Sequence, residues 1–309
     1  MYSSERLKGV HMFVCVADTG SFAAAAERLN VTASAVSKGI ARLEDRLQSR
    51  LFERTTRSLS LTDAGTSFYQ ACTRVMSELE EAEQSLHGDS SEPAGIIRVD
   101  LPAWYGRMHA FPIILKLVQA HPKIVPNVSF TDRIVDLVED NIDIVVRIGG
   151  SEIWPDDLDH QFLGMERMIF CASAAYLQEH GAPLDETDLQ NHRFVLYGLP
   201  KGKGSPLFTG VQAGERKRRV VAGNMIVGDG ESQVMAVLAG HGIAQLSTWM
   251  LQEHLQTGAL VEVLPHLATE GLPVNLVWRK KRHKLRRVRI MLEMLATLLT
   301  PDGRIEARR

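Results

Sequence analysis

The 309-residue chain contains few cysteines and no paired cysteine motif. Cys15, Cys72 and Cys171 are widely separated, and none belongs to a CxxC pair. This spacing argues against a disulfide framework and indicates no structural metal site. Because free cysteines most often pack inside a protein as small apolar side chains, we expect three buried, unreactive thiols.

The sequence also lacks long apolar runs and catalytic motifs. No stretch approaches the roughly 20 apolar residues that span a bilayer, and the N-terminus has no charged-then-apolar secretory signal. Eleven His and 37 acidic residues are scattered without HExxH, a nucleophile elbow or a carboxylate pair assignable to one site. We therefore expect a cytoplasmic protein with no membrane partner, no catalytic residues, no cofactor and no metal.

Residues 20–44 predict two short helices joined by a tight corner. Ser21 can accept a hydrogen bond from the first helical turn, and the alanines that follow favour a helix. Asn30 tolerates the left-handed backbone that ends such a helix, and Thr32 offers a second N-cap. The apolar residues after Thr32 recur at steps of four, three and four, which places them on one helical face. They are Val36, Ile40, Leu43 and Leu47.

The opposite face of this second helix carries small, hydroxyl-bearing and basic side chains. They are Ala33, Ser34, Ser37, Lys38, Ala41 and Arg42. A helix that enters the DNA major groove needs small residues near the base edges and Ser, Lys or Arg near edges and phosphates. The same pattern also suits an ordinary αα-hairpin with a solvated polar face, so the spacing alone leaves both interpretations open.

Residues 51–62, LFERTTRSLSLT, predict a short β-hairpin with Arg54 and Arg57 in its polar turn. From residue 28 to residue 57 there are seven Lys or Arg and three acidic residues, a local excess of four positive charges. The whole chain, in contrast, has a net charge of -2. This asymmetry indicates a surface that faces phosphates.

A long helix with a narrow apolar seam follows, and Thr62 can cap it. The seam residues recur at heptad spacing and are Phe68, Cys72, Val75, Leu79, Ala82 and Leu86. Such a helix either lies on its own domain or pairs with a second copy. We favour dimerisation, because little neighbouring sequence could cover the seam. Residues 88–95 are polar and contain Gly, Pro and Ser, which predicts a hinge.

From residue 96 onward, short apolar runs alternate with amphipathic helical patterns, which predicts a buried parallel sheet in two α/β lobes. We place lobe I at about residues 96–160 and 266–300, and lobe II at about 161–265. The expected helices of lobe I include residues 107–120 and 132–139. Open sheets of this kind bind ligands beyond the carboxyl ends of their strands, so we expect a ligand between the lobes.

The residues near these strand ends are the candidate ligand contacts. They are Pro102, Ala103, Trp104, Tyr105, Thr131, Asp132, Arg147, Tyr197, Gly228 and Asp229. Trp104 and Tyr105 offer an aromatic wall, and Arg147 could bind an anionic group through two hydrogen bonds. Arg147 could also pair with Asp132 or Asp143 instead, and the sequence leaves that alternative open.

Residues 7–86, and more loosely the rest of the chain, resemble the LysR-type transcriptional regulators. The similarity rests on the helix pair, the Arg-containing hairpin and the long helix after it. It implies an α+β multidomain protein with a winged helix-turn-helix at residues 1–61 and a dimerisation helix at residues 62–87. Behind the hinge at residues 88–95 it implies a periplasmic-binding-protein-like effector domain of two lobes at residues 96–300.

The resemblance also implies a function. The expected protein is a sequence-specific DNA-binding regulator that responds to a small-molecule effector, acting as a homodimer or homotetramer on a roughly palindromic site in double-stranded DNA. The candidate DNA contacts are Ser21, Thr32, Ala33, Ser34, Ser37, Lys38, Arg42, Arg54, Thr56 and Arg57. Many family members carry Ser or Thr at the positions of Pro102 and Ala103 to hold an effector carboxylate. Their replacement here argues against a carboxylate-first mode of recognition.

Two other classes of function remain open. The chain could be a small-molecule-binding α/β protein or an enzyme with an incidental N-terminal helical module. Ligand binding or turnover that is unaffected by deleting residues 1–90 would favour that class. It could also be an architectural DNA binder whose cleft takes no ligand, in which case its footprint would not change with any metabolite.

Overall fold

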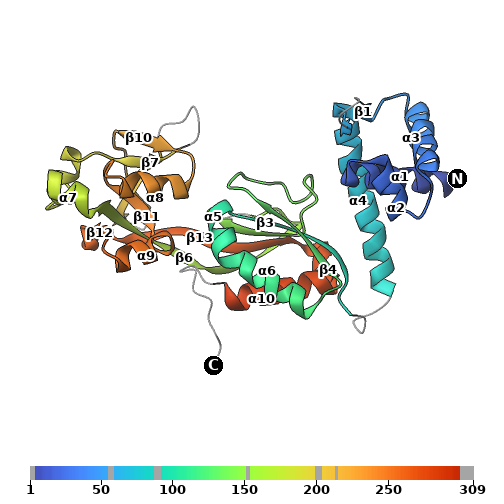
Figure 1. Ribbon diagram of the computed structural model, residues 1–309. Coiled ribbons are helices and arrows are strands. Elements are labelled where there is room, and N and C mark those ends of the chain that lie inside the picture. The colour runs from blue at the N-terminus through green and yellow to red at the C-terminus, as the bar shows by residue number, and fades with distance from the viewer. Residues whose placement is uncertain are drawn as a thin grey trace. The chain divides into compact units, whose positions relative to one another are not determined.

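The computed structural model describes residues 4–54, 59–86, 92–150, 154–198, 204–212 and 215–299 (Figure 1). The chain divides into two compact units, which we describe separately. Residues 1–91 and 135–141 form the first, and residues 92–134 and 142–309 form the second. Within the described ranges, no single helix is long and apolar enough to cross a membrane. The bent pair formed by Leu7–Thr19 and Phe22–Arg28 has sufficient length and apolar composition only when its two helices are counted together.

The first unit consists of short helices, a β-hairpin and a long helix. In chain order the elements are α1 (Ser4–Thr19), α2 (Phe22–Arg28), α3 (Ala33–Leu47), β1 (Phe52–Arg54), β2 (Leu59–Leu61) and α4 (Asp63–Leu86). Phe13 of α1 is fully buried, and its ring centroid lies 5.3 Å from those of both Phe52 and Phe68. The predicted helix pair, hairpin and long helix are therefore confirmed, and they share one aromatic core.

Side-chain caps determine where the helices of this unit begin. Ser21 Oγ, Thr32 Oγ1 and Thr62 Oγ1 each accept a hydrogen bond from the backbone amide three residues later, at 3.4, 3.2 and 2.9 Å. Asn30 has a φ of 53°, the left-handed conformation expected where α2 ends. The predicted caps are confirmed, and each is worth about 1 kcal/mol of stability.

The apolar seam of α4 divides into two parts. Phe68 and Cys72 pack into the core of the first unit, whereas Val75 and Leu79 are 51% and 41% exposed. The side chains of the seam positions 82 and 86 lie outside the described residues. The first part of the seam therefore covers its own domain, and the second part presents apolar surface to solvent.

The second unit is organised on one seven-stranded sheet. Its strands follow the order β11-β6-β13-β5-β3-β4, and β12 also pairs with β6. Their bounds are β3 (Gly95–Leu101), β4 (Ile124–Phe130), β5 (Ile144–Ile148), β6 (Leu158–Ser173), β11 (Ala244–Ser247), β12 (Leu260–Val263) and β13 (Thr269–Arg279).

The predicted parallel sheet is confirmed only in part. Strand β3 is parallel to β4 and β5, but β13 is antiparallel to β5 and β6, and β6 is antiparallel to β11 and β12. The difference arises because the chain passes from lobe I to lobe II along the long strand β6 and returns along β13. Two strands that carry the chain in opposite directions side by side must pair antiparallel.

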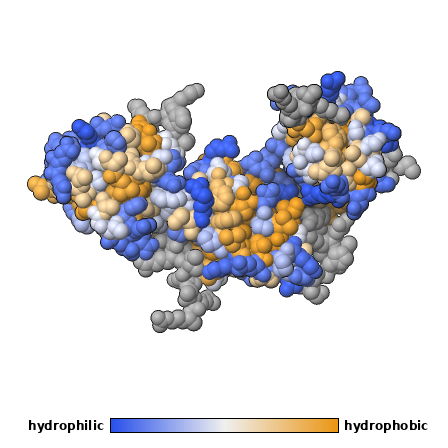
Figure 2. All heavy atoms as spheres, in the orientation of Figure 1, coloured by the Kyte–Doolittle hydropathy of each residue, from blue (hydrophilic) through white to orange (hydrophobic). Residues whose placement is uncertain are grey.

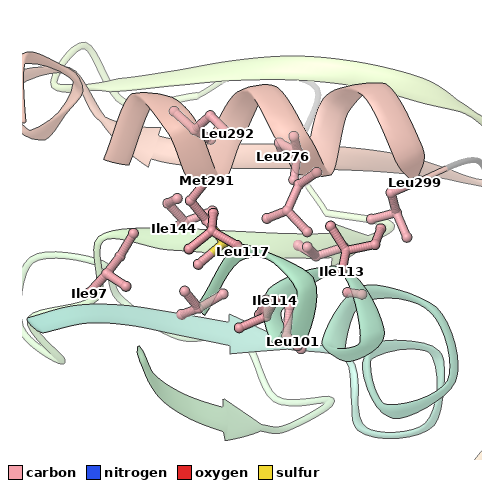
Figure 3. Close-up of a cluster of buried hydrophobic side chains, with 14 of the residues drawn as sticks. Ile97, Leu101, Ile113, Ile114, Leu117, Ile144, Leu276, Met291, Leu292 and Leu299 are labelled. Atoms are coloured by element: carbon pink, nitrogen blue, oxygen red, sulfur yellow. The ribbon is translucent and has the colours of Figure 1, made fainter. Parts of the chain in front are cut away.

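Helices cover the sheet of lobe I. They are α5 (Ala103–Tyr105), the π-helical segment η1 (Gly106–Ala110), α6 (Phe111–Ala120), the 3₁₀ segment η4 (Lys280–Lys284) and α10 (Arg286–Leu298). Ile113 and Leu117 of α6 and Met291 of α10 are fully buried together with Ile97 and Ile144 of the sheet (Figure 3). The helix predicted for residues 107–120 is confirmed in substance, although helical structure begins earlier, at Ala103.

Lobe II is built from smaller elements around the other end of the sheet. They are α7 (Ala174–His180), η2 (Asp188–Asn191), β7 (Val195–Tyr197), β8 (Leu207–Gln212), β9 (Glu215–Arg219), β10 (Met225–Val227), α8 (Gly230–Leu238), α9 (Thr248–Gln256) and η3 (Pro265–Leu267). Strands β7 and β10 form a separate parallel pair, and β8 and β9 form an antiparallel hairpin. Neither α9 nor the β8–β9 hairpin was predicted from the sequence.

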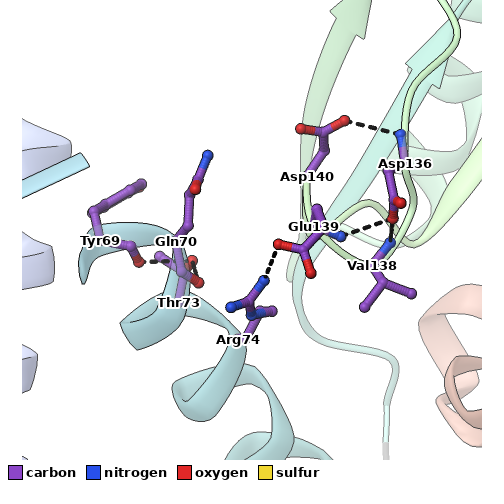
Figure 4. Close-up of polar contacts among 8 residues, drawn as sticks. All are labelled: Tyr69, Gln70, Thr73, Arg74, Asp136, Val138, Glu139 and Asp140. Atoms are coloured by element: carbon purple, nitrogen blue, oxygen red, sulfur yellow. Dashed lines mark hydrogen bonds and ion pairs between the residues drawn. The ribbon is translucent and has the colours of Figure 1, made fainter. Parts of the chain in front are cut away.

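The helix predicted for residues 132–139 is wrong, because this segment forms turns. Asp136 Oδ1 accepts hydrogen bonds from the amides of Val138 and Glu139 at 2.8 and 2.9 Å (Figure 4). An aspartate that bonds to its own following backbone competes with helix formation. Glu139 also forms an exposed ion pair with Arg74 of α4 at 2.7 Å, a contact of the kind that adds little stability.

All three cysteines are buried, as expected. Burial raises the pKa of the Cys72 thiol to about 11 and that of the Cys171 thiol to about 12. Both thiols are therefore protonated near neutral pH, and the thiolate is the reactive form of cysteine. Packing, rather than redox chemistry, accounts for these residues.

Candidate functional site

The solvent-facing side of α3 carries most of the side chains predicted to contact DNA. Thr32, Ala33, Ser34, Lys38 and Arg42 are exposed and Ser37 is half-buried. On the opposite side of the helix, Val36, Ile40 and Leu43 are buried. Helix α3 therefore presents small and hydroxyl-bearing residues near its N-terminus and cations one and two turns further along.

Ser21 and Thr32 have a structural role that precedes any contact with DNA. Their hydroxyl oxygens cap α2 and α3. A hydroxyl that accepts one backbone hydrogen bond still has a donor hydrogen and a second lone pair. Both residues can therefore cap a helix and contact a phosphate at the same time.

Glu44 of α3 has a positioning role that the sequence analysis did not predict. Its Oε1 accepts hydrogen bonds from the amides of Leu51 and Phe52 at 2.8 and 3.2 Å, which joins α3 to the start of the hairpin. The sequence offered one sign of this role, because Glu44 interrupts a predominantly basic stretch. Arg54 pairs with Leu59 through the backbone, whereas its side chain, Thr56 and Arg57 lie outside the described residues.

A cavity of about 460 Å³ lies in the second unit and is lined by residues of both lobes. Seven predicted ligand contacts line it: Pro102, Trp104, Tyr105, Thr131, Asp132, Arg147 and Tyr197. Ala103, Gly228 and Asp229 were also predicted but are not among the lining residues. The volume is within the range of about 300–1,000 Å³ that is typical of sites for small organic ligands.

Most of the remaining wall comes from elements that the sequence did not associate with a ligand. Strand β6 contributes Glu166 and Met168, and β11 and α9 contribute Gln245, Ser247, Trp249 and Met250. Leu207 and Leu272 complete this group, and Leu196 and Gln233 also line the cavity. Glu166 and Met168 escaped prediction because they lie in the middle of β6, a strand that crosses between the lobes, rather than at a strand end.

Aromatic rings form one side of the cavity. The ring centroid of Trp249 lies 5.4 Å from that of Trp104 and 5.1 Å from that of Tyr105, both in edge-to-face geometry. This arrangement is the favourable one for paired aromatic rings and holds each ring in place. The predicted aromatic wall of Trp104 and Tyr105 therefore has Trp249 as a third member.

Asp132 and Arg147 face the cavity but use part of their bonding capacity within the protein. Asp132 Oδ1 accepts a hydrogen bond from the Ala103 amide at 2.9 Å. Arg147 donates to the Arg133 carbonyl at 2.7 Å, and burial lowers the pKa of its guanidinium while Asp100 and Asp132 oppose that shift. Asp143 is instead fully buried beside Arg282, at 3.3 Å. Its pairing with Arg147, an alternative left open by the sequence, is therefore wrong.

Glu166 is the buried carboxylate of the cavity wall, with 4% of its surface exposed. Its Oε1 accepts hydrogen bonds from Ser247 Oγ at 2.8 Å and Trp249 Nε1 at 2.7 Å, and its Oε2 accepts one from the Leu272 amide at 3.3 Å. Burial raises the pKa of this carboxyl group, and the three hydrogen bonds oppose that shift.

Three features that involve the second lobe complete the site. Asp229 caps α8, since its Oδ1 accepts a hydrogen bond from the Ser232 amide at 2.8 Å. Burial raises the pKa of the Tyr197 hydroxyl, and the nearby carboxylates of Asp132 and Asp229 raise it further. Arg107 of η1 and Glu231 of α8 form an ion pair at 3.1 Å between the two lobes.

The architecture of the chain is that of a two-domain regulator, with a helix-turn-helix module and a two-lobed domain that encloses a small-molecule cavity. Family models support both parts. Residues 7–66 match the bacterial regulatory helix-turn-helix protein, lysR family, and residues 90–300 match the LysR substrate binding domain. The chain therefore belongs to the LysR family of transcriptional regulators.

Individual relatives and solved structures align with this chain over nearly its full length. The HTH-type transcriptional regulator YhjC of Escherichia coli (strain K12) is 32% identical over 96% of this chain and 98% of its own. The HTH-type transcriptional activator AaeR of the same strain is 28% identical over 97% of this chain and 96% of its own. The structure of CrgA, a LysR-type transcriptional regulator from Neisseria meningitidis, matches with a TM-score of 0.59 and 28% identity over 96% of this chain and 98% of that chain. The full-length structure of AphB, a virulence activator of Vibrio cholerae, has a similar fold, with a TM-score of 0.58, 24% identity, and coverage of 94% of this chain and 98% of that chain.

The family answers the question left open by the α3 pattern. The protein is a ligand-responsive DNA-binding regulator of transcription.

Proposed function

We propose that two copies of this regulator pair through α4 and place their α3 helices in successive major grooves of a roughly palindromic DNA site. The observation that carries the proposal is the exposure of Val75 and Leu79, which lie one turn apart on α4. Surface apolar residues aligned in this way gain stability when a second copy covers them. Two modules related by a twofold axis meet half-sites about 34–36 Å apart, or a multiple of that distance.

A second apolar surface bears on the size of the assembly. Met108 of η1 and Leu115 of α6 are 57% and 50% exposed, and Figure 2 shows hydrophobic side chains gathered over this region of the second unit. Clustered apolar surface of this kind commonly marks a protein interface. We propose that the protein is a homodimer or homotetramer, and that it acts in the cytoplasm, where its DNA is.

Within each copy, we assign different tasks to the two kinds of side chain on α3. Ser34 and Ser37 lie near the helix N-terminus and are positioned to approach base edges, whereas Lys38 and Arg42 supply positive charge for phosphates. The predicted contributions of Arg54, Thr56 and Arg57 come from the hairpin. The cavity takes the effector, and its occupancy changes the packing of the copies and hence the distance between the two DNA-binding modules.

A binding experiment tests this assignment. Duplex DNA from the region upstream of the protein's own gene is titrated with the full chain, and the bound sequence is then mutated position by position. Ser34→Ala and Ser37→Ala should change which positions matter, whereas Lys38→Ala should weaken binding to all sequences alike. If Ser34→Ala and Lys38→Ala have the same effect on every sequence, α3 does not read bases as proposed.

A further inference from the structure

The charges that line the cavity are mainly negative. Asp132 and Glu166 line it, Asp229 lies beside it, and Arg147 is a lining residue of opposite sign. Asp100 and Asp132 are close enough to Arg147 to act on its guanidinium group. An anionic ligand would have to approach these carboxylates, so the field in the cavity favours a neutral or positively charged compound.

Glu166 is the group through which such a compound would be recognised. An ionised carboxylate can accept about four hydrogen bonds, and the protein supplies three, from Ser247, Trp249 and Leu272. The influences on the pKa of this carboxyl group are burial, which raises it, and the three hydrogen bonds, which lower it, with no cation among them. Ionising a buried carboxyl group without a cation is costly, and a ligand cation would stabilise the ionised form.

The backbone of β13 next to Glu166 allows the Glu166 carboxyl group to line the cavity. The pairing of β13 with β6 is irregular between Glu270 and Pro273, where Leu272 donates its hydrogen bond. A Cβ atom on Gly271 would lie 2.7 Å from Met168 Cγ and 3.0 Å from Glu166 Cβ. Glycine at this position therefore allows β13 to pass close behind the carboxylate.

The other residues that line the cavity indicate which apolar group the ligand carries. Trp104, Tyr105 and Trp249 form the aromatic side, and Met168, Met250 and Leu272 add flexible apolar surface. Aromatic faces attract cations as well as apolar rings. The Ala103 amide, at the start of the helix after β3, could otherwise donate a hydrogen bond to a ligand carboxylate. It already donates to Asp132 Oδ1.

On the basis of the proposed effector site, we propose that the cavity recognises an aromatic amine without a carboxylate, with the ammonium group on Glu166 and the ring between Trp104, Tyr105 and Trp249. This inference concerns the chemistry of the effector alone. It depends on the proposed role of the cavity but not on the way in which the protein contacts DNA.

Three probes with a common phenylalkyl body test the polar group. Phenethylamine, 2-phenylethanol and 3-phenylpropanoate are titrated into the full chain, and binding is followed by tryptophan fluorescence and by calorimetry. We expect phenethylamine to bind at least about tenfold more tightly than the alcohol, because hydrogen bonds to charged groups are stronger than neutral ones. The acid should bind most weakly. Binding of the acid as tightly as the amine, or no binding of the amine at millimolar concentration, would overturn the proposal.

A pair of matched variants locates the recognition. Glu166→Gln keeps the shape of the side chain and removes its charge, so it should weaken phenethylamine binding by about ten- to a hundredfold while changing 2-phenylethanol binding by less than about threefold. Asp159→Asn removes an exposed carboxylate from the same strand β6 and should change neither. Unchanged amine affinity in Glu166→Gln would contradict the assignment.

A second variant keeps the test decisive if Glu166→Gln fails to fold, as judged by circular dichroism. Asp132 is exposed, and Asp132→Asn should raise the affinity for 3-phenylpropanoate by about tenfold, because it removes a like charge from the cavity. No gain in that variant would count against the proposal.

All preparations are also assayed for DNA binding without ligand. If the unmodified chain binds DNA but not the amine, the proposed ligand class alone is rejected. If the unmodified chain does not bind DNA, the proposed function is rejected.

Discussion

The exposed half of the α4 seam predicts how strongly the protein dimerises. Fully burying a Val or Leu side chain is worth about 1.5–3 kcal/mol. Scaling this by the exposed fractions of 51% for Val75 and 41% for Leu79, and counting both copies, gives about 3–5 kcal/mol for the pair of positions. Replacing both with Gln, which is as compatible with a helix as Leu, should therefore raise the dissociation constant of the dimer by about 10²–10⁴-fold.

Sedimentation velocity over a range of concentrations measures this change directly. The double variant Val75→Gln, Leu79→Gln should dissociate at concentrations where the unmodified chain is dimeric, while its thermal unfolding changes little. Leu184→Gln is the matched control, because Leu184 is 86% exposed and lies far from α4 in the sequence. If the double variant and the control sediment alike at every concentration, α4 is not the dimer contact and the reasoning is refuted.

Three further predictions concern the hairpin, the core and pH. Replacing Arg57 with Ala should weaken binding to all DNA sequences and reduce the slope of log affinity against log salt by about 1, and an unchanged slope would remove the hairpin from the interface. Asp143→Ala should destabilise the second unit by about 3–5 kcal/mol in urea unfolding, because it removes one member of the buried ion pair between Asp143 and Arg282, and a loss below about 1 kcal/mol would contradict that reasoning. Burial lowers the pKa of His192, against the opposing effect of Asp188, so folding favours the neutral ring and stability should fall as pH drops below about 6.5. The midpoint of urea unfolding, measured at about pH 7.5 and about pH 5.5, should change less with pH in His192→Gln than in the unmodified chain. The same change in both proteins would rule out His192 as its source.

The helices and the hairpin of residues 4–86 were predicted almost completely because their structure is local. Caps at Ser21, Thr32 and Thr62 and the left-handed Asn30 act within a few residues of their own position, so their chemistry can be read from neighbouring residues. The seam of α4 could not be resolved in the same way. Its spacing is uniform, and only the folded unit shows that Phe68 is used by the domain's own core while Leu79 is left exposed.

The effector domain was predicted less well because its main features depend on distant contacts. The antiparallel direction of β6 and β13 follows from the path of the chain between lobes, which hydrophobic patterns do not encode. The same crossing brings Glu166 to the cavity, where it meets Ser247 and Trp249, more than 80 residues away in the sequence. The rule that ligands lie at strand ends found Trp104, Tyr105 and Asp132 but had no means of finding a residue in the middle of a strand.

If the regulator pairs on a twofold-related DNA site and responds to a ligand in its cavity, footprinting should show both properties. The full chain is footprinted on the DNA upstream of its own gene, with and without phenethylamine. We expect two protected half-sites of related sequence, separated by whole helical turns, and a change in their spacing or in the cleavage between them when the amine is added. A single isolated half-site, or a footprint that is identical at every amine concentration that saturates the cavity, would contradict it.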